Sequence, residues 1–158
     1  MYGSLVYAAE LETRTVRILQ RIGSEWMQHY VIDLSDISDT AIWITLSISN
    51  GRLFMCDLVN SALYTYTTNG ALIDKCGGRG SGVGEMNFPF ICGSNAEGAV
   101  MVADSGNKRL QVRDSANEWH VIQLQPQVEY PKSVILLNDA LFVVSGHFSG
   151  EWSLMKYH

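Results

Sequence analysis

Short runs in which apolar and polar residues alternate recur along the 158-residue chain. The runs are rich in β-branched and aromatic side chains, and none keeps a helical spacing of apolar positions for three turns. Three runs superimpose without gaps and end on an acidic residue, and a fourth ends on serine: residues 6–10, 53–57, 100–104 and 141–145. The pattern therefore predicts an all-β chain made of repeats.

The spacing of these runs predicts the architecture. Their last residues lie 47, 47 and 41 residues apart, and a turn pair such as Asn50-Gly51 precedes each of the last three. A second short strand follows each run, and an outer strand follows the second in the first three units. Repeats of this length with four strands each are typical of β-propeller blades. We expect one domain, residues 1–158, with blades near residues 1–34, 41–76, 88–124 and 131–158.

The expected strands do not fill four complete blades. With a to d denoting innermost to outermost, the order is b-c-d, a-b-c-d, a-b-c-d and a-b-c, which gives about 3.5 to 4 four-stranded antiparallel blades. A propeller arc leaves open blade faces and strand edges, which favour aggregation. A segment of a longer propeller is the favoured interpretation. The alternatives are a homodimer that closes the ring and four distorted blades that close on themselves.

The third unit carries a specific motif. The stretch from Gly78 to Pro89, GRGSGVGEMNFP, leads into residues 97–112, EGAVMVADSGNKRLQV. This closely resembles the NHL repeat, a β-propeller family, over about 35 residues. The second unit matches more weakly, because it keeps Asp57, Asn60 and Leu63 but lacks the basic pair of the repeat. The resemblance implies a propeller like that of tripartite-motif/NHL proteins.

The polar residues of the motif are expected to be mostly structural. Asp104 ends a strand, where its carboxylate can accept backbone N–H groups of the turn. Gly106 is expected to supply a positive φ that Asn107 could also tolerate. The glycine run lets the chain cross from the outer edge of one blade to the inner edge of the next. The repeat-structural set is Asp57, Asn60, Gly80, Gly82, Asp104, Gly106 and Asn107.

Arg79, Lys108 and Arg109 are the candidate partner-binding residues. They lie in the b–c and d–a loops of one unit, which emerge on the same side of a blade, and they would form a small basic spot on an acidic protein. The resemblance implies that this side binds proteins in some NHL propellers and single-stranded RNA in others. A structural role, such as an arginine that bridges to a neighbouring blade's carboxylate, is the first interpretation. Three cations without a broad groove then favour a protein partner over RNA.

Catalytic and metal chemistry finds little support in the sequence. The glycine run lacks the spacing of a phosphate loop, and no Gly-Lys-[Ser/Thr] follows it. The histidines His29, His120, His147 and His158 do not pair at metal-ligand spacing, and no Cys-x-x-Cys occurs. We therefore expect no metal, no cofactor and no catalytic residue. A metal-dependent propeller lyase or lactonase is the third alternative.

Charge and composition change this picture only slightly. The net charge is −5 without a basic or acidic tail, which excludes a bulk electrostatic footprint for nucleic acid. No apolar run could span a membrane, and the first residues do not resemble a signal peptide. Three widely spaced cysteines favour a reducing compartment, so we expect a cytoplasmic protein.

The expected function is a non-catalytic interaction module, as in substrate recognition by ubiquitin ligase-type NHL proteins, with any ligase activity in other domains.

Overall fold

The computed structural model describes residues 4–10, 12–37, 44–137, 140–146 and 150–157. These residues form fourteen strands and one short 3-10 turn, Ser105–Asn107. None of the described segments is a helix long and apolar enough to cross a membrane. The strands are β1 (Leu5–Glu10), β2 (Thr15–Ile22), β3 (Glu25–Asp33), β4 (Ile44–Ser49), β5 (Arg52–Asp57), β6 (Ala62–Thr67), β7 (Leu72–Gly77), β8 (Pro89–Ser94), β9 (Val100–Asp104), β10 (Arg109–Arg113), β11 (Trp119–Ile122), β12 (Pro131–Leu137), β13 (Ala140–Gly146) and β14 (Trp152–Tyr157).

The strands pair into four antiparallel sheets, which we call blades 1 to 4. Blade 1 is β1-β2-β3, blade 2 is β4-β5-β6-β7, blade 3 is β8-β9-β10-β11 and blade 4 is β12-β13-β14. Each sheet is a meander in which every strand pairs with its neighbours in sequence. The arrangement of three, four, four and three strands confirms the expected all-β architecture of four-stranded blades that are incomplete at both ends.

Local sequence explains why these strands begin and turn where they do. The β4–β5 hairpin turns at Asn50 and Gly51, whose φ angles of 48° and 70° favour Asn and Gly. Pro89 and Pro131 begin the innermost strands of blades 3 and 4. Proline lacks a backbone N–H, so the first residue of a strand is one of the few places in a sheet that accepts it.

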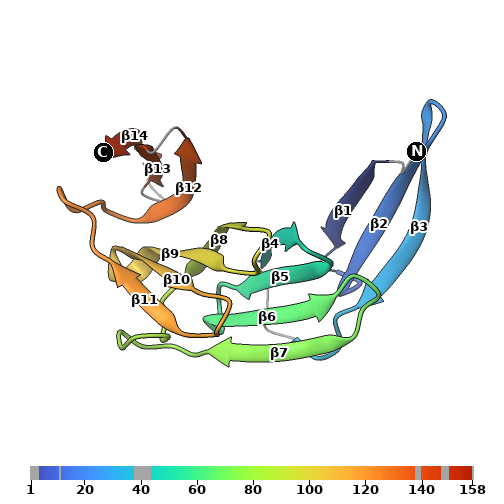
Figure 1. Ribbon diagram of the computed structural model, residues 1–158, viewed down its shortest axis with the longest axis horizontal. Helices are drawn as coiled ribbons and strands as arrows, with labels where there is room; N and C mark the ends of the chain where they lie inside the picture. The colour runs from blue at the N-terminus through green and yellow to red at the C-terminus, as the bar shows by residue number, and fades with distance from the viewer. Residues whose placement is uncertain (1–3, 11, 38–43, 138–139, 147–149, 158) are drawn as a thin grey trace.

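The blades follow one another along an arc (Figure 1). Apolar clusters fill the space between neighbouring blades, one cluster for each of the three contacts. Alternation along β5 shows how one strand serves two contacts. Leu53 and Met55 belong to the cluster shared with blade 1, whereas Phe54 and Cys56 belong to the cluster shared with blade 3. Each inner blade is therefore buried on both faces.

The connections place one set of loops at one edge of the arc. Residues 58–61 and 105–108 join the second and third strands of blades 2 and 3. Residues 78–88, here called the glycine-rich loop, join the outermost strand β7 to the innermost strand β8. A hydrogen bond from Asn107 Nδ2 to the Gly80 carbonyl connects this loop with the β9–β10 turn (2.8 Å). We call this edge of the molecule the loop edge.

Candidate functional site

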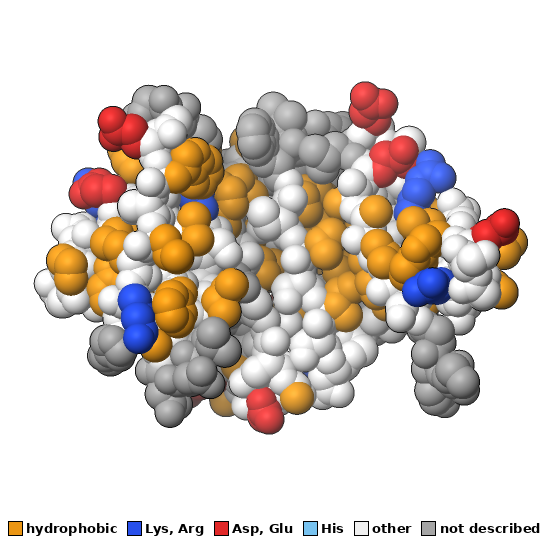
Figure 2. Space-filling view, turned by 90° about the horizontal axis from the view of Figure 1, so that it is seen from above, with side chains coloured by type: hydrophobic (Ala, Val, Ile, Leu, Met, Phe, Trp, Pro, Cys, Tyr) orange, Lys and Arg blue, Asp and Glu red, His pale blue; other side chains and the backbone are white. Residues whose placement is uncertain are grey.

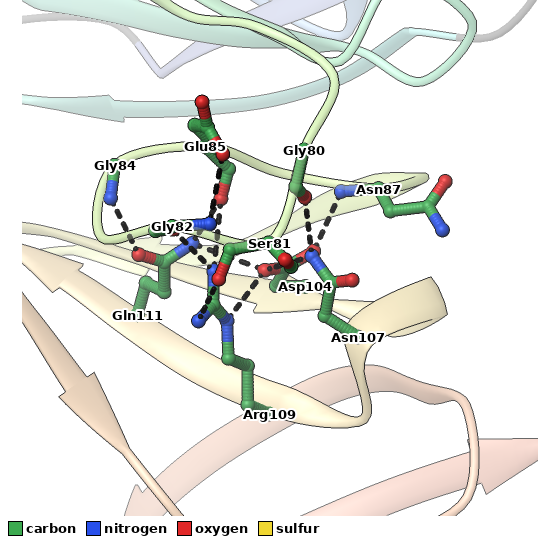
Figure 3. Close-up of polar contacts among 10 residues, drawn as sticks. All are labelled: Gly80, Ser81, Gly82, Gly84, Glu85, Asn87, Asp104, Asn107, Arg109 and Gln111. Atoms are coloured by element: carbon green, nitrogen blue, oxygen red, sulfur yellow. Dashed lines mark hydrogen bonds and ion pairs between the residues drawn. The ribbon is translucent and has the colours of Figure 1, made fainter.

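A buried carboxylate organises the loop edge of blade 3. Asp104 is completely buried, and its two oxygens accept hydrogen bonds from four residues (Figure 3). The donors are the backbone N–H of Asn87 (2.7 Å), Asn107 Nδ2 (2.9 Å), Arg109 Nε (2.8 Å) and Gln111 Nε2 (3.1 Å). A charge buried this deeply is stable only when it is paired and hydrogen-bonded, as this one is.

Arg109 joins this carboxylate to the glycine-rich loop. Its guanidinium donates to the carbonyl oxygens of Ser81 (2.8 Å), Gly82 (2.7 Å) and Glu85 (3.1 Å) in addition to Asp104. The side chain is only 9% exposed. Arg109 therefore holds the loop from the inside of the molecule, because a planar guanidinium can donate to several acceptors at once.

Gln111 completes the contact with the glycine-rich loop. Its amide donates to the Glu85 carbonyl (2.7 Å) and accepts a hydrogen bond from the Gly84 backbone N–H (2.9 Å). The Glu85 carboxylate also accepts from the Gly82 backbone (2.8 Å), which closes the turn. The loop is thus held by side chains at both of its sides, although it contains four glycines, at positions 78, 80, 82 and 84.

The role of Gly106 differs from the expectation. Gly106 does not have a positive φ; Lys108 has the left-handed conformation in this turn instead, with φ 56° and ψ 40°. A Cβ at Gly106 would lie 2.5 Å from Asn87 Nδ2, so glycine is needed for close packing. Similarly, Cβ atoms at Gly80 and Gly82 would meet the Glu85 side chain. These glycines allow the loop to pack closely on its neighbours.

Blade 2 carries a simpler version of the same turn. Asp57 is completely buried and accepts hydrogen bonds from the backbone N–H groups of Val59 and Asn60, both 3.0 Å long. The Asn60 side chain donates to the same carboxylate (2.7 Å). Asp57 and Asn60 thus share with Asp104 and Asn107 the hydrogen bond from the Asn side chain to the carboxylate. The expectation that Asp104 accepts backbone N–H groups of its own turn is corrected, because its backbone donor is Asn87 of the glycine-rich loop.

The three candidate cations have different environments. Arg79 is exposed, and its guanidinium lies 5.8 Å from the centre of the Phe88 ring. Lys108 is partly exposed and pairs with Glu129 (2.6 Å), and this hydrogen bond raises the Lys108 pKa. Arg109 is buried beneath the glycine-rich loop. The expectation of three surface cations is therefore corrected for Arg109, whose guanidinium holds the loop from inside.

The glycine-rich loop carries apolar side chains on its outer side. Val83 is 66% exposed and Phe88 is 41% exposed, and Arg79 stacks on Phe88. We call these exposed side chains of the loop, Arg79, Val83 and Phe88, the loop patch; within it Arg79 and Phe88 are in contact. Exposed apolar side chains beside an arginine are typical of protein contact surfaces, whose centres are enriched in aromatic residues and arginine. Sequence reasoning did not select Val83 or Phe88, because glycine-rich loops carry no signal of which side chains face outward.

One group of possible metal ligands occurs in the described part of the chain. Ligand atoms of Asp114, Glu118 and His120 lie within 4.8 Å of one another near the β10–β11 turn. His120 Nε2 lies 2.8 Å from Asp114 Oδ2, and this hydrogen bond lowers the pKa of Asp114. Glu118 and His120 are exposed. His147 and His158 lie outside the described residues, and His29 lies on β3 away from this group.

Comparison with known proteins places the chain by its fold. No protein-family model and no curated protein matches it. Among solved structures, it is similar to a streptogramin B lyase with a TM-score of 0.65 and 13% identity, which covers 97% of this chain and 53% of the lyase. It is also similar to the selenomethionine-substituted virginiamycin B lyase from Staphylococcus aureus, with a TM-score of 0.64, 14% identity and coverage of 98% and 53%.

A third neighbour is described as KlHsv2 with loop 6CD replaced by a Gly-Ser linker. It has a TM-score of 0.57 and 11% identity, and the match covers 100% of this chain and 56% of that one. The neighbours are β-propeller proteins, so the chain has a propeller-like fold. The chain spans about half the length of the solved structures that it matches.

Proposed function

We propose that the chain is a non-catalytic interaction module that binds a protein partner through the loop patch. The observation that supports this proposal is the fixed glycine-rich loop. Arg109 and Gln111 hold its backbone from inside the molecule, while the loop patch faces outward. A surface that is already ordered loses little conformational entropy on binding, which favours affinity.

The chemistry of the patch indicates the kind of partner. Phe88 and Val83 offer apolar area, and Arg79 offers a cation whose own contact is the Phe88 ring. Arginine binds carboxylates in a planar, bidentate manner and retains its charge at any physiological pH. We therefore infer a partner segment that combines an acidic side chain with an apolar one.

The resemblance of residues 78–112 to the NHL repeat agrees with this function. It implies that the module selects proteins for modification by other domains, as in ubiquitin ligase-type NHL proteins, within the cytoplasm. The residues of this chain that carry the resemblance, Asp104, Asn107 and Arg109, form a hydrogen-bonded turn that supports the loop with the patch.

Single-stranded RNA is the second candidate ligand, because a base could stack beside Arg79 and Phe88. Two observations disfavour it relative to a protein. Lys108 is neutralised by Glu129, and Arg109 is buried, so one exposed arginine is left from the three expected cations. Tight RNA binding uses several phosphate contacts and therefore several exposed cations.

A metal-dependent lyase is the third candidate, suggested by the names of the two lyase structures. Likeness at 13–14% identity supports the fold alone. The Asp114, Glu118 and His120 group lies at one turn of one blade and is largely exposed. Catalytic metal sites are usually enclosed, and further residues hydrogen-bond to each ligand and orient it. Measuring the metal content of the purified chain tests this candidate, and one tightly bound ion per chain would favour it.

Selection from a phage-displayed library of random peptides tests the proposed function. The full chain is the target, and selected peptides are then measured by fluorescence polarisation. We expect peptides with acidic and apolar residues, and we expect Arg79→Glu and Phe88→Ala each to weaken binding by about tenfold or more.

Arg52→Glu, at the opposite edge of blade 2, is the matched control and should bind as the wild type does. Peptides that bind equally well to all variants would overturn the proposal. Salt-dependent binding of a single-stranded uridine 20-mer that is lost in Arg79→Glu would replace it with RNA recognition.

A further inference from the structure

Among the described residues, nothing packs on one broad sheet face of each terminal blade. On blade 4, Val143, Met155 and Tyr157 pack toward blade 3. Side chains alternate between the two faces along β12, β13 and β14, so the residues next to these packed ones point to the opposite side. On that side Ile135 is 62% exposed and Leu154 is 67% exposed. We call Ile135, Phe142, Val144, Trp152 and Leu154 the C-terminal end face.

Blade 1 has the corresponding uncovered face at the other end of the arc. Tyr7 and Ala9 pack toward blade 2, so Val6 and Ala8 point away from it. Val6 is 43% exposed and pairs with Leu19 across the β1–β2 ladder. We call Val6, Ala8 and Leu19 the N-terminal end face. Arg17 and Glu10 form an exposed ion pair (2.7 Å) on the same side of this sheet.

The repeat pattern shows what the C-terminal end face corresponds to inside the molecule. Residues 141–145 align with residues 53–57, so Phe142 and Val144 take the positions of Phe54 and Cys56. In blade 2 these two side chains are 2% and 0% exposed, because they belong to the cluster packed against blade 3. The C-terminal end face is therefore equivalent to a surface that a following blade covers.

The N-terminal end face corresponds to the opposite half of the same contact. Residues 6–10 align with residues 100–104, so Val6 and Ala8 take the positions of Val100 and Val102. Both valines are buried, at 1% and 0% exposure, in the cluster that blade 3 shares with blade 2. The two end faces are thus the two complementary halves of one kind of blade contact.

The orientation of the end faces allows both to be covered at once. Figure 2 views the molecule from the side on which the arc is open, and hydrophobic side chains gather over β12–β14 at one end and over β1–β3 at the other. The chain covers 53% of each lyase that it resembles, so it forms about half of such a propeller. A second half turned by a two-fold axis would meet both end faces.

We propose that two copies of this chain close a ring, with the C-terminal end face of each copy packed on the N-terminal end face of the other. The contact between copies repeats the contact between blades 2 and 3. Such a head-to-tail contact uses two different surfaces, and it makes a closed ring only when the rotation between copies closes. The two contacts of the dimer are identical, and the loop patch lies outside both. This inference does not depend on the proposed function.

Light scattering after size exclusion, together with sedimentation velocity, measures the assembly of the purified full chain. We expect a discrete species of twice 17.6 kDa. Leu154→Glu places a charge in both contacts of the ring, so it should raise the dimer Kd by about 100-fold or more. Leu72→Glu is the matched control, because Leu72 is a strand residue that is 41% exposed outside the end faces, and it should remain dimeric.

A charge exchange distinguishes this contact from other modes of association. Val6→Lys alone should also yield monomers, whereas the double variant Val6→Lys with Leu154→Glu should recover a substantial part of the dimer. Circular dichroism verifies that each variant keeps its strands. A wild-type chain that is a stable monomer at about 100 μM, well above typical interface Kd values, would overturn the proposal. A dimer that persists in both single variants, or a series of open multimers without a discrete dimer, would overturn it as well.

Discussion

The Arg109 guanidinium and the Asp104 carboxylate lie 2.8 Å apart, with both side chains almost fully buried beneath the glycine-rich loop. Removing the cation would leave a buried carboxylate without its charged partner. We expect Arg109→Met to lower the free energy of unfolding by about 3 kcal/mol, measured by urea denaturation. The control is Arg52→Met, at an exposed arginine of blade 2 that lies outside both end faces, and it should change stability much less than Arg109→Met does. Equal effects of the two variants would contradict a special role for the buried pair.

The Asn107 side chain ties the glycine-rich loop to the β9–β10 turn through the Gly80 carbonyl. Asn107→Ala removes that bond together with two to Asp104, so we expect a loss of about 1–2 kcal/mol. The loop should also be cut faster by trypsin at Arg79. Asn60→Ala, at the equivalent position of blade 2, should leave the rate of cleavage at Arg79 unchanged. A wild-type cleavage rate in Asn107→Ala would show that other contacts hold the loop.

Close packing of Gly106 on Asn87 predicts a specific rescue. Gly106→Ala introduces a Cβ only 2.5 Å from Asn87 Nδ2, and we expect it to destabilise the chain by about 1–3 kcal/mol. Asn87→Ala removes the obstructing amide, so the double variant should be more stable than the sum of the two single effects predicts. A double-mutant cycle in urea measures this coupling. Additive effects would indicate that the backbone moves instead.

The Asp114–His120 hydrogen bond predicts a pH dependence. The bond from His120, and then those from the Glu118 and Ala116 backbone, hold the Asp114 pKa below its ordinary value of 3.8. In the unfolded chain this carboxyl binds its proton at a higher pH than in the folded chain. Its contribution to the free energy of unfolding is therefore fully present above pH 3.8 and is lost as the pH falls through the lowered pKa. The free energy of unfolding, measured by urea denaturation at a series of acidic pH values, should therefore fall less steeply below pH 3.8 for Asp114→Asn than for the wild type. Identical curves would show that the hydrogen bond does not persist in solution.

The sequence predicted the sheets well because their signal is local and repeated. The alternation in residues 53–57 and 100–104, together with the spacing of 47 residues, places equivalent strands at equivalent positions of successive blades. The burial of Asp57 and Asp104 at the ends of those strands follows from the same register. Tyr64 and Tyr66 alternate with threonines, a pattern that predicts an aromatic strand face packed between blades, and both lie in the cluster between blades 1 and 2.

The detail of the loop edge was less accessible from sequence. Arg109 looked like a surface cation because the loop that covers it lies 24 to 28 residues earlier in the chain. Gln111 was missed, although a polar residue in the middle of an apolar strand is a usable signal of a buried hydrogen-bond network. The positive φ belongs to Lys108, and no residue preference predicts a lysine there.

Because apolar clusters lie between neighbouring blades, stability in this chain accumulates contact by contact along the arc. In such linear arrays, local unfolding starts at the ends and the middle units open last. Amide protons of β5 and β9, each flanked by packed blades on both sides, should therefore exchange with solvent most slowly. In a single chain, those of β1 and β14 should exchange fastest, and closure of the ring by a second copy should slow their exchange.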